Sequence, residues 1–199
     1  WLVLGDRSSS MTEAIETARQ VSAILAKAIE DSVYLVMFNE TPTFYDATGR
    51  TYADLQALTA RERASGMTSI GCGLRYCADK GIEVDGIAIV SDGGENSSPF
   101  FTAAYADYSK RTGMTPMVYY YRVAAQPSDS LSKLLDKAGI DYQVFDLGQS
   151  VDYTSLPNIV QTMRPTRYAL VEEIEQSPLS TLDEVLTRTV GMPVLTMPA

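Results

Sequence analysis

The sequence contains no histidine, and this absence excludes several kinds of site. The Ser-His-Asp and Cys-His catalytic schemes need an imidazole, most zinc sites use one, and histidine is the most common general base. The P-loop pattern, the Gly-x-Ser-x-Gly elbow and a dinucleotide loop after the first strand are also missing. An aspartyl phosphotransferase would need a second acid two residues after Asp6, where Ser8 stands. We therefore expect a protein that is not an enzyme.

Basic residues, cysteines and long apolar runs are also scarce. The chain has 16 Lys and Arg against 25 Asp and Glu, a net charge of -9, so we expect no direct nucleic-acid binding by this domain. No apolar run reaches the roughly 18–20 residues that span a bilayer, and we expect no membrane contact. On one helix, Cys72 and Cys77 would lie about 7.5 Å apart along the axis, too far for a relaxed disulfide. Free thiols favour a cytoplasmic location.

The sequence that remains alternates between strand-like and helix-like segments. Continuous apolar runs, typical of strands buried on both faces, alternate with segments of 3.6-residue periodicity. Ser10 and Glu13 have the spacing of a capping box at the start of the first helix. Pro42 favours an edge position for its strand. We therefore predict an α/β fold, with a doubly wound, mainly parallel six-stranded sheet flanked by helices. Its strands are expected at 1–6, 33–38, 42–45, 84–91, 117–123 and 142–147, and its helices at 11–29, 52–63, 70–80, 101–108 and 131–138.

One domain is expected over residues 1–163, followed by an extension over 164–199. A last helix should start near Leu156, and the alternation stops at Pro165. Thr181 and Glu184 again have capping-box spacing. Because the chain begins inside what should be a buried strand, we expect it to be part of a larger polypeptide.

Three polar loops follow strands or precede helices, at residues 6–10, 66–71 and 91–95. The carboxyl edge of an open α/β sheet is where such folds bind ligands. Each loop also has an ordinary interpretation, because Ser10 and Thr68 are common helix caps and Asp92 a common turn residue. Glu95 is expected to be a solvated loop residue. Arg7 either steers acidic partners or has a plain surface role.

These loops resemble the metal-ion-dependent adhesion site of the von Willebrand factor A-type (vWA) family, written Asp-x-Ser-x-Ser, then Thr, then Asp. Met11 after the first motif and the Gly-x-Thr-x-Ile-Gly-x-x-Leu run from Gly66 to Leu74 match the family as well. The resemblance covers residues 1 to about 163 and implies the Rossmann-like vWA fold. It also implies a Mg²⁺ site (or Mn²⁺ or Ca²⁺) with one position open for a partner's carboxylate. The ligands it implies are Asp6, Ser8, Ser10, Thr68 and Asp92.

The chemistry of these side chains agrees with such a cation. Mg²⁺ prefers oxygen ligands in octahedral geometry, keeps several waters and seldom has a wholly protein-made cage. We therefore expect a divalent-metal-dependent module that binds a protein partner through an Asp or Glu carboxylate. Two alternatives stay open. In the first, the loops are only caps and turns of a metal-free scaffold. In the second, this is the vWA part of a Ro-type RNA-binding protein, which residues 81–86, the strand to Asp92 and the following helix through residues 110–113 resemble.

Overall fold

The structure is a computed structural model that describes residues 1–29, 31–123 and 130–148. The chain divides into a unit Trp1–Pro165 and a unit Thr166–Ala199, and every described residue belongs to the first. The domain boundary predicted at 163/164, the helix predicted near Leu156 and the 164–199 extension lie outside the described residues. All three stay predictions.

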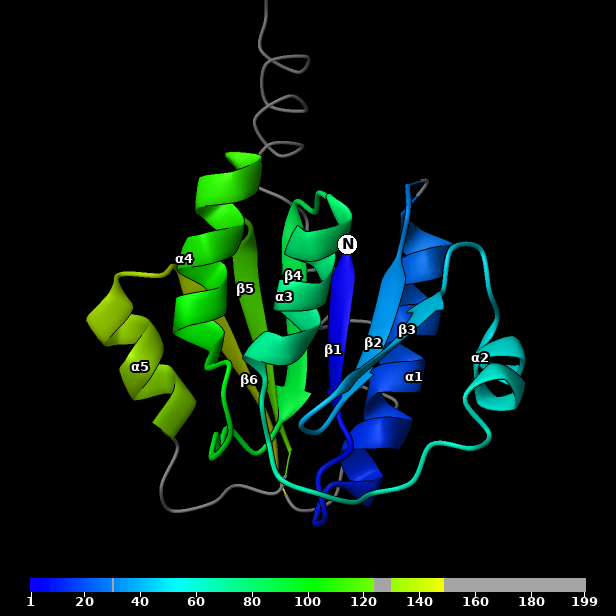
Figure 1. Cartoon of the computed structure of the whole chain (residues 1–199). Helices are drawn as coiled ribbons and strands as arrows, with labels where there is room; N and C mark the ends of the chain where they lie inside the picture. The colour runs from blue at the N-terminus through cyan, green and yellow to red at the C-terminus, as the bar shows by residue number, and fades with distance from the viewer. Residues whose placement is uncertain (30, 124–129, 149–199) are drawn as a thin grey trace, which may run out of the picture. The chain divides into compact units, whose positions relative to one another are not determined.

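Within the described residues, six strands form one sheet in the order β3-β2-β1-β4-β5-β6 (Figure 1). All of them except β3 run parallel to one another. β3 (Pro42–Asp46) pairs antiparallel with β2 at the edge, where the missing N–H of Pro42 is tolerated. This confirms the predicted doubly wound, mainly parallel sheet. The parallel strands are β1 (Leu2–Asp6), β2 (Tyr34–Phe38), β4 (Gly86–Ser91), β5 (Met117–Val123) and β6 (Tyr142–Gly148).

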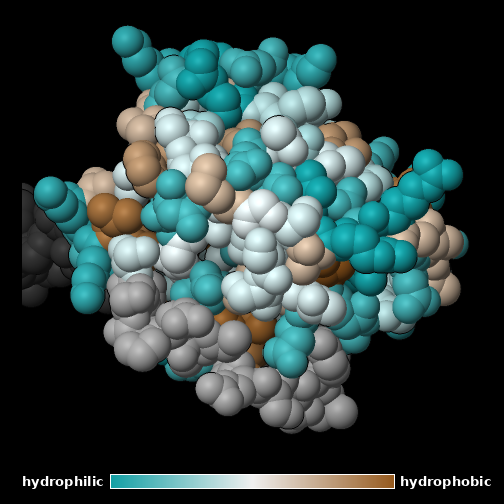
Figure 2. Space-filling view, turned by 60° about the horizontal axis from the view of Figure 1, so that its bottom comes forward, coloured by the Kyte–Doolittle hydropathy of each residue, from teal (hydrophilic) through white to brown (hydrophobic). Residues whose placement is uncertain are grey.

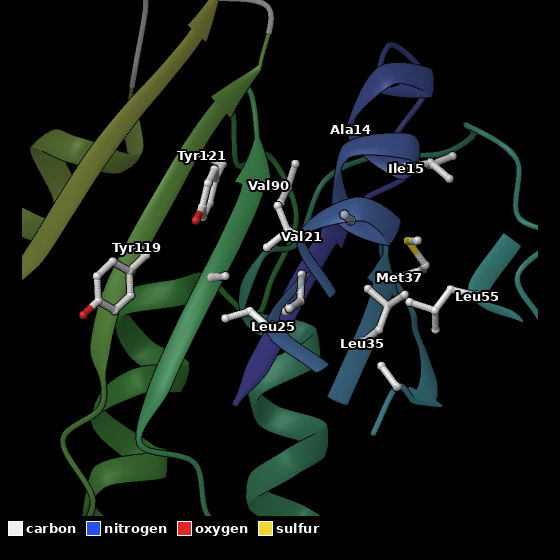
Figure 3. Packing of buried hydrophobic residues seen from close by; sticks show 14 of the residues in the cluster. Ala14, Ile15, Val21, Leu25, Leu35, Met37, Leu55, Val90, Tyr119 and Tyr121 are labelled. Atoms are coloured by element: carbon white, nitrogen blue, oxygen red, sulfur yellow. The ribbon is translucent and has the colours of Figure 1, made fainter. Parts of the chain in front are cut away.

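Helices cover both faces of the sheet and enclose a hydrophobic core on each side. One core contains residues of α1 (Thr12–Ala28) and α2 (Tyr52–Leu58). The other contains residues of α3 (Gly71–Lys80), α4 (Phe101–Thr112) and α5 (Ser130–Ala138). Side chains of β5 alternate between the two cores, as the strand pleat requires. Tyr119 and Tyr121 fill the α1 side (Figure 3) and Tyr120 the α3 side, so the tyrosine run is core filling.

Gly5 allows α1 to approach β1 closely. A Cβ atom at Gly5 would lie 2.6 Å from Ala18 Cβ and 2.8 Å from Met37 Sδ, closer than carbon contacts allow. Glycine removes this clash, so α1 packs directly against the strand that ends at Asp6. The small residue is therefore a packing requirement of the first strand–helix unit.

The end of α3 lies where the sequence predicts it, whereas α2 ends earlier than predicted. α3 ends at Lys80 with Gly81 in the left-handed region, as predicted, and both cysteines on this helix are buried and free. α2 ends at Leu58, so the predicted end at residue 63 is wrong. Arg19 of α1 donates to the carbonyl and the hydroxyl of Thr59, at 2.8 and 2.6 Å, and satisfies the end of α2 from another helix. No helix in the described part of the chain is long and apolar enough to cross a membrane.

Candidate metal site

The first loop (residues 6–10) follows β1 and the third loop (91–95) begins at the last residue of β4, and these two strands are neighbours in the sheet. From β1 the chain continues to β2 on one side, whereas from β4 it continues to β5 on the other. Such a switch point is where open α/β sheets bind ligands. The second loop (66–71) leads into α3. The site therefore lies at the carboxyl edge of the parallel strands, the lower edge in Figure 1.

Backbone hydrogen bonds hold the three loops together. The amide and the hydroxyl of Ser9 donate to the Gly66 carbonyl at 3.3 and 2.9 Å, which joins the first loop to the second. The amides of Asn96 and Ser97, next to the third loop, donate to the Thr68 carbonyl at 3.1 and 3.0 Å. The Thr68 amide in turn donates to Asn96 Oδ1 at 2.8 Å. The second loop is thus held from both sides.

Asp6 ends β1 with a carboxylate that has no exposed surface. The Ser8 amide donates to Oδ1 at 2.8 Å, and the Ser91 hydroxyl donates to Oδ2 at 2.6 Å. Burial raises the pKa of Asp6 to about 6, the nearby charge of Asp92 adds to the rise, and the hydrogen bonds oppose it. Within the described residues, no Lys or Arg pairs with this carboxylate. Asp6 is therefore a buried acid without a cationic partner there.

Ser8 and Ser10 occupy different environments in the first loop. Ser8 is only 5% exposed, whereas Ser10 is exposed. The capping box predicted at Ser10 is absent, because the N-cap of α1 is Met11 and no side chain caps it. The Met11 amide donates to the Ser8 carbonyl at 2.9 Å, and this turn moves the helix start past Ser10. The Ser10 hydroxyl is thus not used as a cap of α1.

The structure gives Asp92 the turn role that the sequence suggested, but it does not give Thr68 the role of a helix cap. Thr68 is 6% exposed. The N-cap of α3 is Ile70, and no side chain caps this helix, so the interpretation of Thr68 as a helix cap is wrong. Asp92 accepts a hydrogen bond from the Gly94 amide at 2.9 Å, which confirms a turn role. One carboxylate oxygen serves that turn, and the side chain stays partly exposed.

Glu95 joins the starts of two helices. Its carboxylate accepts hydrogen bonds from the amides of Ile70 (2.9 Å) and Gly71 (3.3 Å) at the start of α3. It also accepts one from Phe101 (2.9 Å) at the start of α4. Burial raises the pKa of Glu95 to about 7, and the backbone hydrogen bonds oppose this rise. The expectation of a solvated loop residue is wrong, because Glu95 is half-buried and bound to both helices.

Ser91 is the residue of the site that sequence reasoning did not identify. It is fully buried, donates to Asp6, and accepts a hydrogen bond from the Gly93 amide at 3.1 Å. The signal for it lies in the strand register. Gly5 pairs with Val90, so the next residues of the two neighbouring strands, Asp6 and Ser91, face each other.

Arg7 is not available as a free cation beside the site. Its Nε lies 3.3 Å from Glu62 Oε2, and the two side chains are 16% and 7% exposed. Glu62 also accepts a hydrogen bond from the Tyr45 hydroxyl. The charge of Arg7 is therefore balanced locally, and the steering role does not agree with this pairing.

The donor set fits a small hard cation. In the described part of the chain, no three acidic or cysteine side chains gather in a way that could hold a metal by themselves. A cation here would therefore depend on hydroxyl oxygens, which Ser8, Ser10 and Thr68 carry beside the two acids. Mg²⁺ accepts such a mixed oxygen set and completes it with water. A positive charge would also stabilise the ionised form of the buried Asp6.

Comparison with known proteins gives a likeness at the level of the fold. No protein-family model matches the sequence, and no curated protein matches it. Among solved structures, the von Willebrand factor type A protein from Catenulispora acidiphila is similar with a TM-score of 0.56 and 15% identity, over 81% of this chain and 41% of that one. The Deinococcus radiodurans Ro (RSR) protein is similar with a TM-score of 0.51 and 17% identity, over 80% of this chain and 34% of that one. The VWA domain of SpRpn10 is similar with a TM-score of 0.51 and 14% identity, over 82% of this chain and 94% of that one.

These values confirm the predicted vWA-type fold. The chain spans less than half the length of the first two proteins, so their other parts have no counterpart in this comparison. At such identities the likeness concerns the fold and does not extend to a metal or a partner. The Ro-type interpretation therefore stays a prediction.

Proposed function

We propose that this chain, which has the fold of a von Willebrand factor A-type domain, is a binding module whose grip on a protein partner depends on a divalent cation. The cation, Mg²⁺ or Mn²⁺ or Ca²⁺, would be held by Asp6, Ser8, Ser10, Thr68 and Asp92. Its partner would present an Asp or Glu carboxylate. We propose no catalysis, and a cytoplasmic location.

The observation that carries this proposal is the burial of Asp6 without a Lys or Arg partner among the described residues. Its carboxylate has two hydrogen-bond donors and lies beside a second acid, Asp92, whose charge disfavours its ionised form. A buried carboxylate is stable when an opposite charge accompanies it. Asp6 and Asp92 also lie at the switch point of the sheet, where open α/β folds bind ligands.

The proposed ligands would differ in the charge that they bring to the cation. Asp6 and Asp92 would supply negative charge, while Ser8, Ser10 and Thr68 would supply neutral oxygen ligands. When bound, the cation would supply a Lewis-acidic position that accepts an anion in place of water. Ser91 would hold Asp6 in place through its 2.6 Å hydrogen bond, and the bonds at Thr68 would fix the second loop.

Isothermal titration of Mg²⁺ and Mn²⁺ into the purified protein tests the proposal. Wild type should bind one cation, and both Asp6→Ala and Thr68→Ala should weaken binding by at least about tenfold, as expected for perturbing a metal site. Thr112→Ala is the matched control, because its hydroxyl donates to the Tyr108 carbonyl and accepts from the Met114 amide at the end of α4 opposite Phe101, and it lies in none of the three loops. No binding at millimolar metal, or equal binding by wild type and Asp6→Ala, would leave the metal-free scaffold as the function.

A further inference from the structure

Large apolar side chains are exposed at three places in the described part of the chain. Leu58 is 41% exposed, Met67 50% and Phe100 45%. Met67 lies in the second loop, directly before Thr68, and Phe100 directly precedes α4. Leu58 is the last residue of α2. Met67 therefore lies in a loop of the candidate metal site, and Phe100 lies in a segment that is hydrogen-bonded to that loop.

The backbones of both residues are fixed while their side chains remain exposed. The Met67 amide donates to Glu40 Oε1 at 3.1 Å. Beside Phe100, the Ser69 hydroxyl of the second loop donates to the Pro99 carbonyl at 2.7 Å. These bonds connect the segment before α4 to the second loop. Because the backbone at these positions is already held, a contact there needs little further ordering of the backbone on binding, which favours a contact role.

The charges around the loops do not favour an acidic partner without a cation. Glu40 and Asp92 add negative charge, and Arg7 is paired with Glu62. The whole chain carries a net charge of -9, so an approaching acid would be repelled at long range. A single cation attracts one carboxylate locally, and the remaining affinity has to come from short-range contacts.

We propose that Met67 and Phe100 are apolar contacts beside the metal site, so that the partner segment carries a large apolar residue next to its acid. This inference rests on the proposed function. It names the partner chemistry: an Asp or Glu flanked by side chains such as Leu. Figure 2, in which the lower edge of Figure 1 comes forward, shows scattered apolar residues among hydrophilic and intermediate ones.

The experiment uses two synthetic nonapeptides of Gly and Ser, each with one central Asp, flanked in one by Leu and in the other by Ser. Binding to the Mg²⁺-loaded protein is measured by fluorescence anisotropy, with EDTA as a reference. Wild type should bind the Leu peptide about tenfold more tightly, which corresponds to about 1.4 kcal/mol and to partial burial of one Leu. Met67→Ala with Phe100→Ala should remove this preference. Leu58→Ala, which removes an apolar side chain that is 41% exposed at the end of α2, should keep it.

The outcomes separate this inference from the proposed function. If both peptides bind in a Mg²⁺-dependent way but wild type does not prefer Leu, or Met67→Ala with Phe100→Ala keeps the preference, the apolar contact is refuted and the metal-bridged function stands. If binding persists in EDTA, or neither peptide binds with Mg²⁺, the proposed function fails and this inference with it. Circular dichroism checks that each variant is folded.

Discussion

The Asp6 carboxylate is a group that is costly to bury. An ionised carboxylate inside a protein needs hydrogen bonds and opposite charge to replace the water it loses. The Ser8 amide and the Ser91 hydroxyl supply the hydrogen bonds. Burial raises the pKa of Asp6, and within the described residues no Lys or Arg pairs with the carboxylate to oppose that rise.

This raised pKa predicts how the stability of the metal-free protein depends on pH. The pKa of Asp6 rises from 3.8 to about 6 on folding, so the folded state binds the proton more tightly than the unfolded chain. The stabilisation is fully present below about pH 4 and is lost as pH rises through about 6. One pKa unit corresponds to about 1.4 kcal/mol, so the loss should be about 3 kcal/mol. Urea denaturation in EDTA across this range measures it.

Asp6→Asn isolates this contribution from that of Glu95, whose raised pKa acts in the same direction. Between about pH 4 and pH 8, the difference in free energy of unfolding between wild type and Asp6→Asn should change by about 3 kcal/mol, to the disadvantage of wild type. A difference that is constant across this range would show that Asp6 is not a buried, uncompensated acid.

At the scale of elements, Glu95 determines how α3 and α4 begin. The first amides of a helix have no partner within the helix and need an acceptor. α3 and α4 have no side-chain cap at their N-cap positions, and one carboxylate serves both. Glu95 therefore couples the second loop, which carries Thr68, to the third loop.

Replacing Glu95 should destabilise both helix starts together. Glu95→Ala leaves the amides of Ile70, Gly71 and Phe101 without their acceptor. The expected loss is about 1–3 kcal/mol in free energy of unfolding, measured by urea denaturation. Hydrogen exchange should accelerate at these three amides. Glu83→Ala, which removes an exposed carboxylate from another loop, should change neither quantity; equal behaviour of the two variants would refute the bridging role.

The strands were predictable because their signal is local. The apolar runs that form β1, β2 and β5 are buried in the sheet, and a continuous apolar run can be recognised in the sequence without knowledge of distant residues. The end of α2 was not predictable, because Arg19 reaches Thr59 from another helix. The false capping box at Ser10 has the right spacing, but the turn between Ser8 and Met11 displaces the helix start.

The candidate site was predictable in its loops and less so in its interactions. Asp6, Thr68 and Asp92 come from the three loops that the sequence placed at one edge of the sheet, and the structure holds these loops together. The roles of Ser91 and Glu95 depend on pairings across 85 and 25 residues. Such partners follow from strand register and helix packing, which local periodicity does not encode.

At the scale of the whole molecule, the topology determines where a ligand can bind. The chain crosses to opposite sides of the sheet from β1 and from β4, and the loops after these two strands meet at that point. The vWA fold provides this position whether or not a metal is bound. The proposed function therefore depends on the side chains at that position, where the proposed ligands are two acids and three hydroxyls.

The most direct measurement is anomalous diffraction from crystals of the protein grown with Mn²⁺. We expect one strong Mn²⁺ peak among the oxygen atoms of the three loops, in contact with hydroxyls of Ser8, Ser10 or Thr68 and near Asp6 and Asp92. The peak should be absent from crystals of Asp6→Ala grown in the same way. A well-ordered structure without a peak at the three loops, or with Mn²⁺ only elsewhere on the surface, would contradict the metal site on which the proposed function depends.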